Sequence, residues 1–92
     1  MNKSELLDQI WLKTQLQKKD CAAALDAALE TITEAVSAGD SVRLVGFGTF
    51  EVKERGERTG RNPRTREPVT IPASRAPVFK AGKQLKDAVN TN

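Results

Sequence analysis

The sequence predicts an α+β fold: a helical body with a small antiparallel sheet and a long protruding β-ribbon arm. Residues 1–39 are rich in alanine and leucine, with apolar residues at helical spacing. From residue 41 the pattern changes to alternating apolar and polar residues, which is the period of a strand. The stretch from Arg55 to Ile71 has few large apolar side chains and an Asn62-Pro63 turn signal. We therefore expect a two-stranded ribbon there, about 30 Å long at ~3.3 Å per residue.

The composition limits the function. Ninety-two residues predict one domain, residues 1–92. A single cysteine, Cys21, and the absence of histidine argue against a zinc site and against histidine-based catalysis. No apolar run is long enough to span a membrane, and Glu5 and Asp8 interrupt any signal-like segment. We expect a cytoplasmic protein that is not an enzyme and has no cofactor, metal, small-molecule ligand or membrane partner.

Two helices are expected in the first part, residues 1–39. Asn2 can cap a first helix with Glu5 as the capping-box acid, and this helix should end near Lys13. A second helix should run from about residue 18 to residue 38 and end at Gly39. Trp11 is interpreted as core or dimer-edge packing, and Cys21 as a small buried apolar residue.

The sheet and arm should occupy residues 41–80, with the arm at about 53–75. Val42 and Leu44 mark one strand, the Gly46-Phe47-Gly48 segment a tight turn, and Phe50 the start of a second strand. A returning strand should bring Phe79 back to the core. A last helix is expected at about 83–90.

The predicted core is thin for one chain. Without the arm, roughly seventy residues remain, and a two-stranded ribbon adds little stability. We therefore expect an obligate homodimer that pools two half-cores and carries two arms. The apolar residues assigned to this dimer core are Leu29, Ile32, Leu44, Phe47, Phe50 and Phe79.

The charge is concentrated in the second half. Residues 1–40 carry four lysines and seven acids, whereas residues 41–92 carry eleven Lys and Arg and five acids. Six of these bases and only two acids fall between residues 53 and 66. A basic ribbon is suited to a polyanion such as duplex DNA. The simpler alternative, a solvated basic loop, does not explain the strand alternation on both sides.

Two further features point to nucleic acid. Pro63 lies between Arg61 and Arg64, and a rigid proline ring can wedge between base pairs from the minor groove. Lysines also open each expected helix: Lys3, Lys18 with Lys19, and Lys83. Helix N-termini bind phosphate, so these lysines predict a second phosphate track on the body.

With these residues in view, the chain resembles the bacterial histone-like HU family of nucleoid DNA-binding proteins, which is related to integration host factor. The most specific part of the resemblance is Gly46-Phe47-Gly48-Thr49-Phe50, followed by Arg55, Arg58, Gly60, Asn62-Pro63 and Thr65. The resemblance covers essentially the whole chain, including Met1-Asn2-Lys3 and Ala81-Gly82-Lys83.

The resemblance implies an intertwined homodimer in the nucleoid that binds the minor groove with two β-arms. It implies that the protein bends and condenses DNA with little sequence preference, including distorted, nicked or gapped duplexes. The alternative is a sequence-specific integration-host-factor-type subunit that acts as a heterodimer. The resemblance implies DNA contact by Lys3, Lys53, Arg55, Arg58, Arg61, Asn62, Pro63, Arg64, Arg66, Arg75 and Lys83, with Pro63 intercalating. It also implies an ion pair between Lys3 and Asp26.

The sequence departs from the family at several positions. Gln15 and Gln17 stand where glycine and serine are usual, and Arg66 where a turn glycine or asparagine is frequent. Trp11 and Cys21 are also unusual. An enzyme acting on nucleic acid is disfavoured because the acids are scattered. A third alternative is a module that binds an acidic protein. Competition by duplex DNA at moderate salt would distinguish it from a DNA-binding protein.

Overall fold

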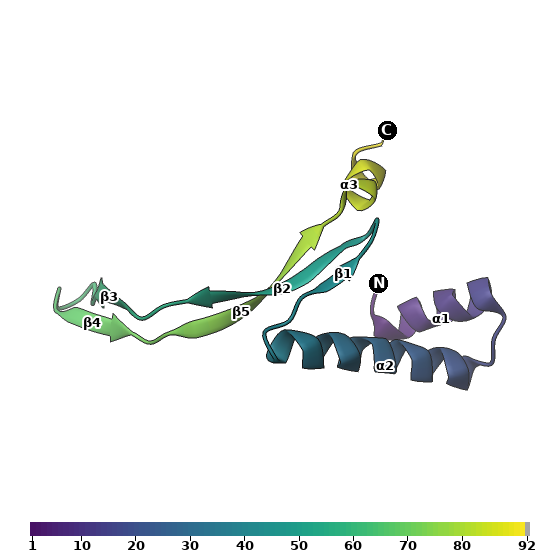
Figure 1. Ribbon diagram of the computed structural model, residues 1–92, viewed down its shortest axis with the longest axis horizontal. Helices are drawn as coiled ribbons and strands as arrows, with labels where there is room; N and C mark the ends of the chain where they lie inside the picture. The colour runs from purple at the N-terminus through teal and green to yellow at the C-terminus, as the bar shows by residue number, and fades with distance from the viewer. Residues whose placement is uncertain (92) are drawn as a thin grey trace. The chain divides into compact units, whose positions relative to one another are not determined.

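The computed structural model describes residues 1–91 and confirms the α+β prediction (Figure 1). The chain divides into two compact units, Met1–Glu34 and the part from Ala35 onward. The elements follow in the order α1 (Lys3–Thr14), α2 (Lys18–Ser37), β1 (Val42–Leu44), β2 (Gly48–Arg55), β3 (Arg58–Arg61), β4 (Pro68–Ile71), β5 (Ser74–Ala81) and α3 (Lys83–Asn90). Among the described residues, no helix combines the length and apolar character needed to cross a bilayer.

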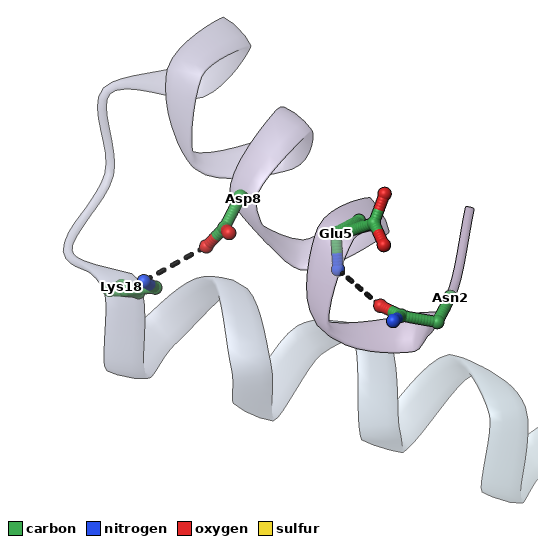
Figure 2. Close-up of polar contacts among 4 residues, drawn as sticks. All are labelled: Asn2, Glu5, Asp8 and Lys18. Carbon is green, nitrogen blue, oxygen red and sulfur yellow. Dashed lines mark hydrogen bonds and ion pairs between the residues drawn. The ribbon is translucent and has the colours of Figure 1, made fainter.

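The first unit consists of α1 and most of α2. Asn2 caps α1, because its side-chain oxygen accepts a hydrogen bond of 2.8 Å from the Glu5 amide (Figure 2). The Lys18 ammonium lies 2.9 Å from the Asp8 carboxylate, and this ion pair, drawn in Figure 2, links the start of α2 to α1. The helix boundaries match the predicted ones within a residue, because the caps that fix them are local.

The turn between α1 and α2 is shaped by Gln15. Gln15 has φ = 58°, in the left-handed region, and its amide donates to the Trp11 carbonyl. Its side chain donates to the Leu12 carbonyl at 2.7 Å. Cys21 is buried, as predicted, whereas Trp11 is 40% exposed in this chain, with the Lys18 ammonium 5.8 Å from its ring centroid.

The second unit contains a three-stranded antiparallel sheet in the order β1-β2-β5. The β1–β2 turn spans Val45 to Phe47, with Gly46 at φ = 85°, a conformation that favours glycine. Phe50 pairs with Phe79 across β2 and β5, with ring centroids 4.7 Å apart, and Phe47 lies 5.5 Å from Phe79. The three phenylalanines assigned to the dimer core therefore lie together.

The β2–β5 ladder extends beyond β1. Strand β1 pairs with β2 only through Val42, Arg43 and Leu44, so from Glu51 onward the ladder consists of β2 and β5 alone. It continues to the pair of Arg55 and Ser74. Pro77 in β5 is tolerated because β5 is an edge strand of this sheet.

A second two-stranded ladder, β3 with β4, follows the first. The ribbon that the sequence predicts as continuous is interrupted at residues 56–57 on one strand and 72–73 on the other. Pro72 has no backbone N–H to donate and Gly56 weakens a strand, which explains a break at this point. The arm therefore consists of two short paired segments.

The described chain has little core of its own. Cys21 is its one buried apolar side chain, while Leu29, Leu44, Phe47 and Phe79 remain 40–48% exposed. Val45 is 93% exposed. Burial of apolar surface is the main driving force for folding, so this degree of exposure is unusual for an independently stable monomer.

Candidate nucleic-acid interface

The arm distributes its cations along both of its paired segments. Lys53 and Arg55 lie near the end of β2, and Arg58 and Arg61 lie in β3. All four side chains are exposed. Alternate residues of a strand share a face, so Lys53 and Arg55 point to one side of β2. The structure thus places the predicted arm cations on regular strands, where their spacing is fixed.

The two faces of the outer segment differ in character. Arg58 and Gly60 lie on the same face as their cross-strand partners Ile71 and Val69. A Cβ on Gly60 would lie 3.0 Å from Cδ1 of Ile71, so the isoleucine side chain lies across the glycine. The opposite face carries polar Thr59, Arg61 and Thr70, together with Pro68. In the outer segment one face therefore carries the apolar Val69 and Ile71 and the other is mostly polar, and each face carries one arginine.

The tip is a compact hydrogen-bonded turn of residues 62–67. The Asn62 amide donates to the Glu67 carbonyl at 3.0 Å, and the Arg66 amide donates to the Asn62 carbonyl at 2.7 Å. The Asn62 side-chain oxygen accepts from the Arg64 amide at 2.9 Å. Thr65 Oγ1 accepts from the Glu67 amide at 3.3 Å. These hydrogen bonds fix the backbone conformation on both sides of Pro63.

This turn brings together the tip residues that the sequence predicted. Pro63 is exposed, and Arg61, Arg64 and Arg66 flank it within three residues along the chain. Arg66 has φ = 61°, in the left-handed region that residues with a Cβ rarely adopt. A rigid apolar ring bordered by three guanidinium groups can insert between stacked bases and neutralise the adjacent phosphates.

The predicted lysines open the helices, but two of them are in ion pairs. Lys3 begins α1 and lies 2.6 Å from Asp26, which confirms the implied pair. Lys18 begins α2 and contacts Asp8. Lys83 begins α3, where Gly82 provides no side-chain cap. The phosphate track is thus best supported at Lys83, because the neighbouring acids offset the charge of Lys3 and Lys18.

Arg75 is placed differently from the other candidate cations. Its guanidinium donates to the Ser37 carbonyl at 3.2 Å, and its Nε lies 3.9 Å from Glu54. Sequence reasoning missed the contact with Ser37, which joins residues 38 positions apart. The last turn of α2 has no basic residue of its own, and this was the available sign that a cation from elsewhere in the chain could lie at the helix end.

Arg43 and Lys80 are two further cations, which were not among the residues predicted from the sequence. Together with Lys83 they line a shallow pocket beside the β1–β2 turn. Lys80 lies 3.4 Å from Glu51 across the sheet. The alternation of charged and apolar residues in β1 and β5 was the signal that could have identified this second basic surface. Within the described part of the chain, no cluster of three potential metal-ligating side chains is present.

Comparisons with known proteins agree with this geometry. A family model described as bacterial DNA-binding protein matches residues 1–90. DNA-binding protein HU-beta of Pseudomonas aeruginosa is 60% identical over 98% of this chain and 100% of that protein. DNA-binding protein HU of Clostridium pasteurianum is 56% identical over 98% and 99% of the two chains.

A solved structure of Anabaena HU in a cocrystal with DNA superimposes with a TM-score of 0.86 at 54% identity, covering all of both chains. The match extends through the helices, the sheet and the arm alike. On the strength of the family model and these near full-length relatives, the chain belongs to the HU family of bacterial DNA-binding proteins.

Proposed function

We propose that this protein is an architectural DNA-binding protein that bends and compacts duplex DNA with little sequence preference. The observation that carries the proposal is the exposed ribbon with six cations between residues 53 and 66 and Pro63 in its tip turn. Cations on a two-stranded ribbon bind the phosphate backbone, which has the same charge in every sequence. The similarity to an HU protein crystallised with DNA supports the same conclusion.

The contacts proposed for DNA lie on the arm and at its edges. Arg and Lys side chains neutralise phosphates, Asn62 shapes the tip, and Pro63 inserts between base pairs, as is known for architectural minor-groove binders including HU. The proposed contact residues on the arm are Lys53, Arg55, Arg58, Arg61, Asn62, Pro63, Arg64 and Arg66. Lys3 and Lys83 complete the proposed set. The resemblance also implies Arg75, but its guanidinium contacts Ser37 and Glu54.

The protein acts as a homodimer in this proposal. Leu29, Leu44, Phe47 and Phe79 are largely exposed in the single chain, and a second copy can cover them. Ile32 and Phe50, which are partly buried, complete the proposed dimer core. Two copies carry two arms, which grip one duplex at two points and stabilise a bend. Nicked or gapped DNA, which is already easier to kink, is therefore a favoured substrate.

Under this proposal the protein is not an enzyme and acts in the nucleoid. Its direct test uses two unrelated duplexes of equal length, with affinity and fluorescence-detected bend measured at several salt concentrations. The expected result is equal affinity for both sequences, a steep loss of affinity with salt, and a bend in both. A marked preference for one duplex, appearing only when a second type of subunit is added, would instead support the integration-host-factor-type alternative.

A further inference from the structure

At the C-terminal end of α2, the Ser37 carbonyl has a partner outside the helix. The Asp40 amide donates to the Ala35 carbonyl at 2.9 Å, and the Gly39 amide donates to the Val36 carbonyl at 3.0 Å. These two bonds form a Schellman motif, with Gly39 at φ = 84°. The Ser37 carbonyl accepts its hydrogen bond from Arg75.

The contact between Arg75 and Ser37 is favourable in both charge and shape. The end of a helix carries partial negative charge, and the last turn of α2 contains no basic residue of its own. A Cβ on Gly39 would lie 3.3 Å from Nη2 of Arg75, so the glycine leaves room for the guanidinium. The contact thus depends on Gly39 for space as well as for its backbone conformation.

Arg75 lies where the β2–β5 ladder, the inner of the two paired segments of the arm, ends. It pairs with Glu54 across β2 and β5, one position before the last pair, Arg55 with Ser74. The strands then break before β3 and β4 begin. The guanidinium donates through Nη1 to Ser37 and approaches Glu54 with Nε, so one side chain links the end of α2 to both strands at the base of the arm.

We propose that Arg75 is a positioning residue that fixes the direction of the arm relative to the end of α2. This inference rests on the proposed DNA-binding function, in which the arm direction decides how strongly the DNA bends. Arginine suits the role because its planar fork directs several donors at once, whereas lysine is a single flexible charge. A residue that only contacts phosphate would need the charge alone.

The test compares Arg75→Lys, which keeps the charge, with Arg75→Gln, which removes it, in the full-length protein. Thermal melting first establishes that both variants are folded. Arg58→Gln serves as the control for a phosphate contact, and Glu54→Gln as the control for the ion pair alone. Affinity, its salt dependence and the bend of an intact duplex are measured for each variant.

We expect both Arg75 variants to bend the duplex less than the unsubstituted protein. The salt slope, which is the slope of log affinity against log salt concentration, should be unchanged. Their affinity should fall by less than about tenfold, because the Arg75 side chain is 49% exposed and its contact with Ser37 is partly solvated. Glu54→Gln should bend DNA normally. Arg58→Gln should lower the salt slope by about one. Arg75 is a phosphate contact, and the proposal is wrong, if Arg75→Lys keeps the normal bend and salt slope while Arg75→Gln lowers the salt slope by about one.

A measurement without DNA separates this inference from the proposed function. Residual dipolar couplings of the backbone amides in β3 and β4, compared with those at the C-terminal end of α2, report how well the arm direction is defined relative to α2. In both Arg75 variants the couplings of the outer segment should shrink toward zero. Unchanged couplings overturn the positioning role, whether or not the protein binds DNA. If the unsubstituted protein fails to bend DNA while these couplings shrink, only the proposed function fails.

Discussion

The backbone amide of Arg66 donates a 2.7 Å hydrogen bond to the carbonyl of Asn62, and Arg66 adopts φ = 61°. The left-handed region costs a residue with a Cβ about 1–2 kcal/mol, and glycine avoids this cost. The arm tip of this protein therefore contains backbone strain at a residue that adds positive charge next to Pro63. Charge and turn stability are in conflict at this position.

Arg66→Gly should tighten the tip turn while weakening DNA binding. Relief of about 1–2 kcal/mol of strain exceeds the entropic cost of about 0.5–1 kcal/mol for a new glycine. Hydrogen exchange of the Asn62 amide, which bonds to Glu67, should therefore slow or stay constant. Arg64→Gly is the matched control, because it removes the same charge and should speed exchange. If hydrogen exchange of the Asn62 amide speeds up equally in both variants, the backbone of Arg66 is not strained.

Gln15→Ala should destabilise the protein more than Gln15→Gly. Both substitutions remove the side-chain bond to Leu12, which contributes about 0.5–1.5 kcal/mol. Only glycine also relieves the left-handed backbone conformation, so the loss on Gln15→Gly should be close to zero. Urea denaturation at one fixed protein concentration measures both. A glycine variant less stable than the alanine variant contradicts this explanation of the α1–α2 turn.

Phe47→Ala should destabilise the dimer by about 3–5 kcal/mol, the usual cost of truncating a buried phenylalanine. The side chain is 48% exposed in the single chain, so a cost of this size requires that a partner covers it. Thermal melting at several protein concentrations measures the loss, because the melting temperature of a dimer depends on concentration.

Leu12→Ala provides the control for Phe47→Ala. Leu12 is also exposed and is not assigned to the dimer core, so its cost should stay within about 0.5 kcal/mol. A stable folded monomer at micromolar concentration in sedimentation would refute the obligate homodimer.

Arg58→Ala should lower the salt slope of DNA binding by about 0.9, the value for one phosphate contact. The loss of affinity should be similar on two unrelated duplexes, because phosphates carry no sequence information. Lys13→Ala, at the end of α1 and outside the proposed contact set, should leave the slope unchanged. A loss confined to one of the two duplexes argues for sequence-specific recognition.

The sequence was informative wherever structure is decided locally. Asn2, Gly39 and the alternation around Phe50 placed the helices and the inner sheet, because caps and strand periodicity act over a few residues. The location of Asn62 and Pro63 at the tip followed from turn chemistry in the same way.

Long-range and strained features were not predictable from the sequence. The contact between Arg75 and Ser37 spans 38 positions, and the lack of a basic residue in the last turn of α2 does not identify which distant cation lies there. The positive φ of Arg66 runs against the preference of its side chain, and only the closed turn imposes it. The break in the ribbon depends on Gly56 and Pro72 falling at the same level of the two strands, in neighbouring positions that are not directly paired, which requires the strand register.

The most direct test of the account separates the wedge from the charge at the arm tip. Pro63→Ala removes an apolar ring and no charge, so the salt slope should remain nearly unchanged. Loss of the wedge should reduce bending of an intact duplex, since insertion offsets the cost of unstacking by wrapping more protein surface. A gapped duplex is already unstacked and should be affected least. Arg64→Ala, the matched control, should flatten the salt slope and weaken binding to both substrates.

The deciding measurement is the fluorescence-detected bend of intact and gapped duplexes of the same sequence, with the unsubstituted protein and with Pro63→Ala. If Pro63 inserts between base pairs, Pro63→Ala should give a smaller bend on the intact duplex and a nearly normal bend on the gapped one. An unchanged bend on the intact duplex, or an equal loss on both substrates, would contradict insertion of Pro63 and leave it with a role only in shaping the turn.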